Sequence, residues 1–376
     1  MASILTPVIL VLGYSGTMGQ RIVRLLQAHM PDATIIGGNR HPSATAAIPT
    51  RHINYADDTT FASGLTDIDI LIHAAGPFQH NPAPLVRACI ERRIHYIDIA
   101  ESLEFINQVR ATAATFTNCP ITLVPGCSTV PGLVNCLINS FTQTQLINHS
   151  GTPPGGRSHI THIDIRLNLG SANPLSAGLL FSLLRPLGQS TGSAEHKPWF
   201  RQLFTFTHMD GRIRQYGNYP VPLSNPIVFH NRSVGISFAT GFDFMAINVL
   251  LFLASFILPH LSDRTLLKLC LWILPPVNLI WGNLFKLIGS AEGRLTLVAC
   301  DLAHLPVEQI ELKATANGLN IPAMTAVWAA QKIAARDPLS GSSIRGCVGL
   351  EQLISDNEVI QHLTQEGYII SRKIYD

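Results

Sequence analysis

The sequence predicts an α/β protein in which a doubly wound parallel sheet is followed by an α+β domain with an antiparallel sheet. Over residues 1–135, short apolar strands alternate with helical segments of roughly 10–14 residues, a pattern typical of parallel sheets covered by helices. From about residue 160, polar and apolar residues alternate with a period of two, which predicts strands with one exposed face. The 376 residues are enough for two domains, which we place at 1–135 and 136–376.

Composition excludes some classes of function. Charged residues make up 13% of the chain, apolar residues 47%, and the net charge is +2. Because Lys and Arg form no dense group, we expect no nucleic-acid partner. The seven cysteines form no C-x-x-C pair, and the chain begins without the basic and apolar regions of a signal peptide. We therefore expect reduced thiols and a cytoplasmic protein.

The first strand and the turn after it predict a phosphate-binding site. The apolar residues 8–12 lead into Gly13, Gly16 and Gly19, and an amphipathic helix follows. Free N–H groups and the positive helix end attract pyrophosphate, and glycine lets the backbone come close. The spacing is G-x-x-G-x-x-G rather than G-x-G-x-x-G, so glycines that serve packing alone are the alternative. We favour the nucleotide-binding end of a Rossmann domain. The residues expected to contact the cofactor here are Gly13, Tyr14, Ser15, Gly16, Thr17, Met18 and Gly19.

The second predicted strand, 33–40, indicates which cofactor binds. It ends about twenty residues after Gly19, where such domains place the residue that contacts the ribose. An Asp or Glu there would hold the 2′-hydroxyl of NAD, but this chain has Arg40, whose guanidinium can pair with a 2′-phosphate. We therefore favour NADP over NAD, with a solvated surface arginine as the alternative.

The elements that follow complete the alternation. A third strand is expected within 51–56, and the strand at 68–78 ends in the turn Ala75, Gly76 and Pro77, where backbone can pass close to the cofactor. Ligands bind beyond the carboxyl ends of parallel strands, where the glycine-rich turns lie together. Further helices and strands are expected in turn at 84–93, 95–101, 103–116 and 121–132.

Five stretches together resemble a known family. They are GYSGTMG (13–19), AGPF (75–78), AC (88–89), YIDIAE (96–101) and GCSTVPG (126–132). These stretches are similar to the NADP-binding domain of the saccharopine dehydrogenase-like oxidoreductases, over about the first 135 residues. The resemblance implies a nicotinamide reductase with a Rossmann domain and an α+β substrate domain. The chain departs from the family where Ala-Glu replaces the more usual Gly-Glu at the end of YIDIAE, and the resemblance leaves the substrate open.

Polar residues at the strand ends are the candidates for chemistry, because the protein must supply a proton or polarise the acceptor during hydride transfer. Asp98 and Glu101 are carboxylates three residues apart, with capping of the next helix as the alternative role. Ser128 can hydrogen-bond nicotinamide or substrate, with turn formation as its alternative. His80 is a further proton donor to consider, and Cys127 is better explained as a small buried thiol. No zinc or hydrolase motif occurs, so we predict no metal site.

Residues 136–376 combine predicted strands and helices in an α+β order. The strand at 162–169 alternates, and residues 204–216 predict a hairpin that turns at Asp210 and Gly211. The remaining elements expected are helices at 175–184 and 323–336 and strands at 294–299 and 309–314.

An apolar insertion at about 244–288 interrupts this domain. Residues 244–262 and 269–285 contain no Asp, Glu, Lys or Arg. A membrane-spanning helix needs about 20 predominantly apolar residues. The first run falls just short of that length, and Pro275 and Pro276 are expected to break the second. Three interpretations remain open: a buried helix pair or hydrophobic dimer interface, an insertion that docks on a membrane or lipid particle, and a transmembrane hairpin.

The sequence thus predicts an NADP-dependent oxidoreductase that reduces an imine, carbonyl or enoyl group of a small or lipid-like substrate. An amino-dicarboxylate substrate would need basic residues in the second domain, and Arg166, Arg212 and Arg214 are the few available. The alternatives are a non-catalytic NADP-binding protein that acts as a membrane-associated scaffold or redox sensor, and a cofactor-free interaction protein. We expect a homodimer, with peripheral membrane contact through 244–288.

Overall fold

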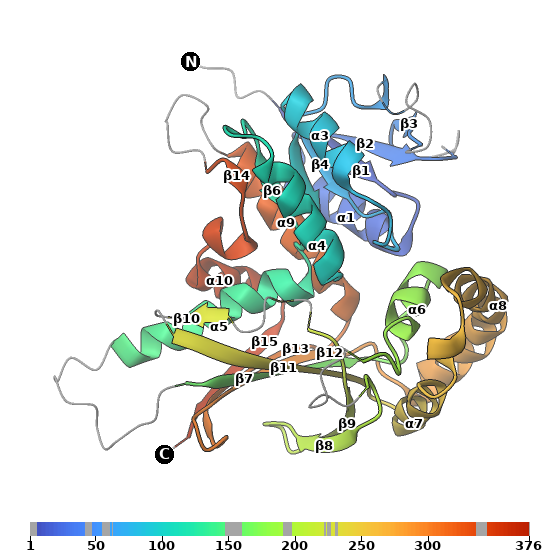
Figure 1. Cartoon of the computed structure of the whole chain (residues 1–376), viewed down its shortest axis with the longest axis vertical. Coiled ribbons are helices and arrows are strands. Elements are labelled where there is room, and N and C mark those ends of the chain that lie inside the picture. Colours follow the sequence, from blue (N-terminus) through green and yellow to red (C-terminus); the bar gives the residue numbers. More distant parts are fainter. Residues whose placement is uncertain are drawn as a thin grey trace. The chain divides into compact units, whose positions relative to one another are not determined.

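The structure of the protein is a computed structural model, in which the chain forms two compact units (Figure 1). Unit 1 comprises Met1–Cys136 and Asn320–Val359, and unit 2 comprises Leu137–Leu319 and Ile360–Asp376. The residues that the structure describes are 6–41, 47–54, 61, 63–146, 160–190, 198–221, 223, 227–229, 232–335 and 344–375.

Unit 1 is built on a parallel sheet, as the sequence predicts. Its seven strands run in the order β14-β6-β5-β4-β1-β2-β3, and every neighbouring pair is parallel. The strand order reverses between β1 and β4, which is where doubly wound sheets bind ligands. The strands are β1 (Val8–Leu12), β2 (Thr34–Asn39), β3 (Thr50–His52), β4 (Ile70–His73), β5 (His95–Asp98), β6 (Thr122–Val124) and β14 (Gly346–Cys347).

Helices cover both faces of this sheet (Figure 1). In this double winding, α1 packs against α9, and α3 packs against α4. Their bounds are α1 (Thr17–His29), α3 (Ala83–Arg92), α4 (Leu103–Ala114) and α9 (Ile321–Ala334), with the short turns η1 (Thr129–Leu133) and η4 (Leu350–Gln352); η3 (Gly318–Asn320) lies at the sequence boundary with unit 2.

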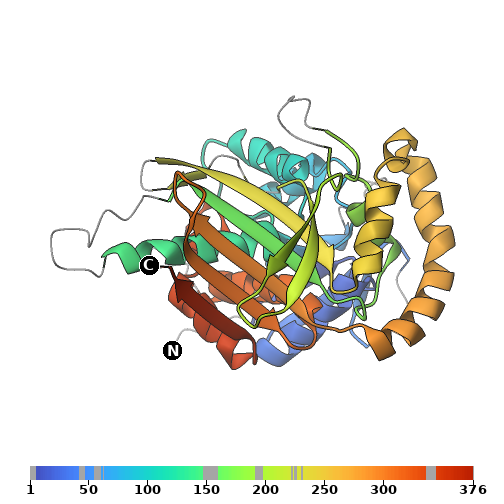
Figure 2. The same cartoon turned by 90° about the horizontal axis from the view of Figure 1, so that it is seen from below.

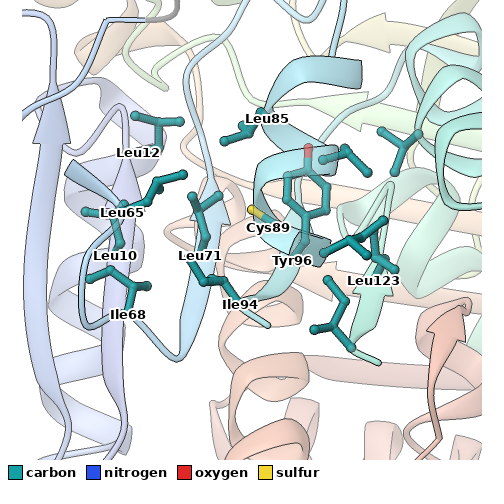
Figure 3. Packing of buried hydrophobic residues seen from close by; sticks show 14 of the residues in the cluster. Leu10, Leu12, Leu65, Ile68, Leu71, Leu85, Cys89, Ile94, Tyr96 and Leu123 are labelled. Atoms are coloured by element: carbon teal, nitrogen blue, oxygen red, sulfur yellow. The ribbon is translucent and has the colours of Figure 1, made fainter. Parts of the chain in front are cut away.

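The core of unit 1 follows from the strand register. Leu10 lies opposite Leu71, Leu71 opposite Tyr96, and Tyr96 opposite Leu123, so one row of side chains crosses four strands. All four are fully buried, and Cys89 of α3 packs over them (Figure 3). Apart from Val8, every residue of β1 and β4 is buried, so both faces of these strands are covered, and this explains their apolar runs without alternation.

Residues 320–359 lie in unit 1, whereas the sequence analysis groups them with the second domain. Here α9 packs on α1, and β14 extends the sheet by pairing with β6. Cys347 lies opposite Leu123 in that pairing, so residues far apart in the sequence are neighbours in the sheet. A local sequence pattern cannot predict a pairing of this kind. The third strand, β3, ends at His52, and residues 55 and 56 of its predicted range lie outside the described part of the chain.

Unit 2 contains a mixed sheet in the order β15-β13-β12-β7-β11-β9-β8, with β10 beside β11. The described neighbours are antiparallel, as predicted, except β7 and β11, which run parallel. The predicted hairpin is confirmed as β8 and β9, and β11 was not predicted. The strands are β7 (His162–Leu169), β8 (Leu203–Thr207), β9 (Ile213–Asn218), β10 (Ile227–Phe229), β11 (Arg232–Phe242), β12 (Gly293–Cys300), β13 (Pro306–Ala314) and β15 (Ile369–Ile374).

The helices of unit 2 include the apolar insertion, which forms α7 and α8. The expected break at Pro275 and Pro276 is wrong, because α8 continues through both residues. These prolines free the carbonyls of Leu271 and Trp272, which lie on the exposed side of the helix where water can bond them. Among the described helices, none is long and apolar enough to cross a membrane. The bounds are α6 (Ala177–Leu184), α7 (Met245–Ala254), η2 (Leu258–His260) and α8 (Asp263–Ile288), with α5 (Val134–Leu146) and α10 (Asp356–Gln365) at the sequence boundaries between the units.

Candidate active site

The glycine turn after β1 is held tightly against the turn after β4. Gly13 has φ +84°, and its N–H donates to the carbonyl of Gly38 at 2.8 Å. A Cβ on Gly13 would lie 2.7 Å from the backbone nitrogen of Ala75, so these two predicted cofactor residues are brought together. The N–H of Ala74 donates to the carbonyl of Leu12 at 2.8 Å and fixes the second turn beside the first.

The same turn presents the start of α1. The N–H of Gly16 donates to the carbonyl of Gly13 at 3.0 Å, and a Cβ on Gly19 would lie 2.2 Å from that carbonyl oxygen. The helix begins at Thr17, with Met18 next, and its first turn has neither a side-chain cap nor an acidic residue. Its positive end therefore has no competing anion within the turn. A Cβ on Gly16 would meet the carbonyl of Gly13 at 3.3 Å and otherwise point into open space among the described residues, so the turn fits a pyrophosphate.

Side chains from the end of β2 complete this part of the site. The amide Nδ2 of Asn39 donates to Ser15 Oγ at 2.6 Å, a contact that the sequence analysis missed. The ring of Tyr14 is buried against Gly37. Arg40 follows Asn39 and is exposed at the strand end, as an arginine that meets a 2′-phosphate must be. The amide beside Arg40 was the sequence signal that could have pointed to Asn39.

Asp98 lies at the end of β5 and ties two turns together. Its Oδ1 accepts the N–H of Gly126 at 2.8 Å and the N–H of Ala100 at 3.0 Å, and its own carbonyl accepts the N–H of Cys127 at 2.7 Å. The side chain is fully buried. Burial raises the pKa of Asp98 to about 6, although these N–H groups and the Tyr96 hydroxyl oppose the rise. Its contacts are those of a residue that positions the site.

Glu101 and Ser128 are brought together, although they lie on different turns. Ser128 Oγ donates to Glu101 Oε1 at 2.7 Å. Ser128 is buried, whereas Glu101 remains accessible to solvent. The protein that surrounds Glu101 still desolvates it enough to raise its pKa, and the Ser128 hydroxyl opposes that rise. Capping of α4 is not the role of either acid, because Ser102 caps that helix by accepting the N–H of Phe105.

Three neighbouring groups, one thiol and two imidazoles, have pKa values that keep them uncharged at neutral pH. Cys127 Sγ donates to the carbonyl of Thr325 at 3.2 Å, and burial raises the pKa of this thiol well above its usual range, which confirms a buried thiol. His73 Nδ1 lies 3.1 Å from the Tyr96 hydroxyl, and burial lowers the pKa of His73 to about 3. Burial also lowers the pKa of His80, so at neutral pH its imidazole holds no extra proton to donate.

Pro77 and Gly76 complete the turn after β4. The N–H of Gly76 donates to the carbonyl of Ala74 at 3.1 Å. A Cβ on Gly76 would meet the Phe78 ring at an ordinary contact of 3.8 Å, so packing alone does not demand glycine there. The small residues leave the backbone of this turn open to a ligand.

In unit 2, most of the basic residues named from the sequence already have acidic partners. Arg212 Nη1 lies 3.3 Å from Glu292, and Arg166 Nη2 donates to Asp164 at 3.0 Å. The strongest network centres on Arg294, which the sequence analysis did not single out. Its guanidinium binds Asp210 and Glu292 at 2.7 Å and Glu311 at 3.0 Å.

This network continues to a buried histidine. His208 Nδ1 lies 2.9 Å from Glu311 Oε2, and its Nε2 lies 2.7 Å from the Tyr216 hydroxyl. His208, Tyr216, Glu311 and Arg294 are all buried. Burial raises the pKa of Glu311, but the hydrogen bond from His208 and the charge of Arg294 outweigh it and lower the pKa overall. These residues satisfy one another and therefore hold the sheet together.

Comparisons with known proteins agree with this geometry. Residues 9–128 match the family described as the saccharopine dehydrogenase NADP binding domain. No curated protein matches the chain. Among solved structures, homospermidine synthase from Legionella pneumophila in complex with NAD is 12% identical, over 99% of this chain and 92% of that chain, with a TM-score of 0.56. An engineered D-amino acid dehydrogenase bound to NADP+ is 12% identical, over 96% of this chain and 99% of that chain, with a TM-score of 0.45.

The homospermidine synthase likeness covers both units and shows a shared fold. The family match adds the cofactor, because it spans the glycine turn, the turn after β4 and the strand that carries Asp98. Residues 9–128 therefore form an NADP-binding domain of the saccharopine dehydrogenase type, which supports an NAD(P)-dependent oxidoreductase.

Proposed function

We propose that the protein is an NADP-dependent reductase that transfers hydride to an imine, carbonyl or enoyl group, with Glu101 as the proton donor and Ser128 as its positioning partner. The observation that carries this proposal is the 2.7 Å hydrogen bond between Ser128 and Glu101. Both follow strands of unit 1 at the carboxyl edge of the sheet, the same edge that carries the glycine turn. Bound NADPH supplies the hydride at this edge.

The surroundings of Glu101 suit a proton donor. Desolvation raises its pKa, so it holds a proton at a higher pH than an ordinary glutamate. Its solvent-accessible carboxyl can be reached by a substrate, and the buried Ser128 hydroxyl fixes one of its oxygens. A positioned acid of this kind contributes roughly 10²–10⁴-fold to the rate. In this proposal Asp98 has an indirect role, because its carboxylate accepts the N–H of Gly126 and so fixes the turn that carries Ser128.

Charge pairing in unit 2 supports a substrate with few charges. A dicarboxylate would need cations that are free to bind it, but Arg212 and Arg294 are already bound to Glu292 and other acids. Arg166 has Asp164 as its partner. This favours a small or lipid-like acceptor over an amino dicarboxylate.

The test is a panel of acceptors. NADPH oxidation is followed with cyclic imines, keto acids, long-chain ketones and enoyl thioesters. We expect turnover with at least one apolar acceptor, and a fall of roughly 10²-fold in kcat for Glu101→Gln with an unchanged Kd for NADPH. Glu104→Gln is the matched control, because Glu104 is an exposed acid on α4 that contacts Gln108. Equal kcat values for the two variants would contradict the role of Glu101.

A second variant separates catalysis from cofactor binding. Gly16→Val places a side chain where the turn faces open space, so NADPH binding should be lost while the thermal unfolding temperature stays close to that of the wild type. Tight NADPH binding without oxidation by any acceptor of the panel would instead favour the scaffold or redox-sensor alternative.

A further inference from the structure

Helix α7 is apolar except for Asn248, which lies on its buried side and hydrogen-bonds the backbone of Phe242. Ile247 and Leu251 face the core of unit 2, together with Phe181 of α6 and Leu266 of α8. The opposite side is equally apolar, and it is exposed. Met245, Val249, Leu250 and Leu253 all lie on that side, and Leu250 is 60% exposed. A contiguous exposed apolar side of a helix is normally covered by protein or by lipid.

Further exposed apolar side chains follow in the segments after α7. Phe256 and Ile257 follow in the turn after α7, and Leu271 and Trp272 lie on α8. Trp272 is 76% exposed, an unusual position for the largest apolar side chain. We call these residues the α7–α8 surface: Met245, Val249, Leu250, Leu253, Phe256, Ile257, Leu271 and Trp272. Figures 1 and 2 show α7 and α8 next to one another at the margin of unit 2.

The turn between the helices is fixed in this exposed arrangement. Arg201 Nη2 donates to the carbonyl of Ser255 at 3.2 Å, and its guanidinium lies 4.3 Å from the centre of the Phe256 ring. Ser255 Oγ donates to the carbonyl of Phe252. The apolar side chains are thus presented on a held backbone, which lowers the entropy lost on binding.

The charges of residues 244–285 that remain after ion pairing are positive. Between residues 244 and 285 the sequence has one acid, Asp263, and it forms an ion pair with Arg185 of unit 2. Arg264 and Lys268 are exposed residues of α8. Arg264, Lys268 and Trp272 are spaced four residues apart, so successive members of this row are neighbours on the helix surface. Cations and a tryptophan beside exposed apolar residues are the features that place a helix in the plane of an anionic lipid surface.

We propose that the α7–α8 surface docks on an anionic membrane or lipid-particle surface, with α7 and the first half of α8 lying in the interface. A second copy of the chain fits the charges less well. In a symmetric contact through this surface, Arg264 and Lys268 of both copies would bring positive charge into the interface, while Asp263, the one acid of the segment, already pairs with Arg185. A lipid surface with anionic headgroups supplies the missing opposite charge.

Flotation with vesicles tests this docking without any turnover, so its result is independent of the proposed reaction. We expect the full-length protein to float with vesicles of phosphatidylcholine and phosphatidylglycerol, and binding to weaken at high ionic strength. The variant Leu250→Glu/Leu253→Glu should reduce the bound fraction roughly tenfold or more, since it removes apolar burial and adds like charge to the headgroups. Arg264→Ala/Lys268→Ala should lower binding to the anionic vesicles selectively.

The control is Leu302→Glu/Leu305→Glu, which changes two leucines of unit 2 that are 83% and 62% exposed and lie outside the α7–α8 surface. This variant should float like the wild type, and NADPH affinity should be the same in all variants if they are folded. Failure of the wild type to float, or equal loss in both leucine pairs, would overturn the proposal. So would a wild-type dimer in sedimentation that Leu250→Glu/Leu253→Glu converts to a monomer without any flotation of the wild type.

Discussion

Asp98 makes the stability of unit 1 depend on pH in a direction that the structure fixes. Its carboxyl is fully buried, and its pKa rises from 3.8 to about 6 on folding. Because the folded pKa lies above the unfolded one, the protonated acid is the form that folding favours. The stability that this group contributes is therefore complete below about pH 4 and is lost as the pH rises through about 6. At 1.36 kcal/mol per pH unit, the loss is about 3 kcal/mol by neutral pH.

The variant Asp98→Asn isolates this effect. The asparagine side chain would keep an oxygen that accepts the N–H groups of Ala100 and Gly126, but it would carry no charge. Urea unfolding of both proteins from acid to neutral pH gives a difference in free energy of unfolding in which the other titrating groups cancel. We expect that difference to move by about 3 kcal/mol in favour of the variant as the pH rises. Amide exchange at Gly126 should report the same change locally.

A second variant separates charge from hydrogen bonding. Asp98→Ala loses the acceptor for two buried N–H groups and should be less stable than Asp98→Asn by about 2–4 kcal/mol at every pH. If the difference between wild type and Asp98→Asn stays constant with pH, the buried carboxyl does not titrate as argued, and its role in holding the Ser128 turn would need another basis.

Three further results are expected. Gly13→Ala should abolish NADPH binding in a fluorescence titration and lower Tm, because its φ is +84° and the new Cβ would lie 2.7 Å from Ala75; an unchanged Kd would contradict this. Glu311→Ala should cost about 3–5 kcal/mol in urea unfolding, because Arg294 stays buried with fewer partners; a loss under about 1 kcal/mol would mean that the remaining acids suffice. Arg40→Ala should weaken NADPH binding roughly tenfold while NADH binding stays the same, and parallel losses would refute contact with the 2′-phosphate.

Local patterns were enough to predict the strands of unit 1 whose neighbours are also buried. The run at 8–12 is apolar throughout because β1 lies between β2 and β4 and both of its faces are covered. The third strand was expected within 51–56 and forms as β3 over Thr50–His52, whereas β14, with two residues, was too short to be predicted. The position of β14 depends on pairing with β6, which joins distant parts of the chain.

The sequence was enough to predict which residues belong to the candidate site, but not which contacts they make with one another. Acids and a serine at strand ends pointed to Asp98, Glu101 and Ser128, but the hydrogen bond between Glu101 and Ser128 depends on the packing of two turns. Likewise, the two N–H groups that Asp98 accepts come from different turns. Capping seemed equally suitable for both acids until the structure showed that Ser102 fills that position.

The distribution of charge in unit 2 explains why composition left its role open. The interior contains Arg294, Glu311 and Glu292, which pair with one another, while Leu250 and Trp272 are exposed. Charged residues make up 13% of the chain, but some of them are buried in ion pairs. The share of charged residues that face solvent is therefore lower than the composition indicates. Burying Arg294 and Glu311 costs desolvation free energy inside unit 2, and exposing Leu250 and Trp272 leaves apolar area in contact with water. A partner that covers the α7–α8 surface would remove that apolar area from water. The insertion thus has two parts: Ile247 and Leu251 belong to the core of unit 2, whereas the exposed residues of the α7–α8 surface are the part that the proposed lipid docking would account for.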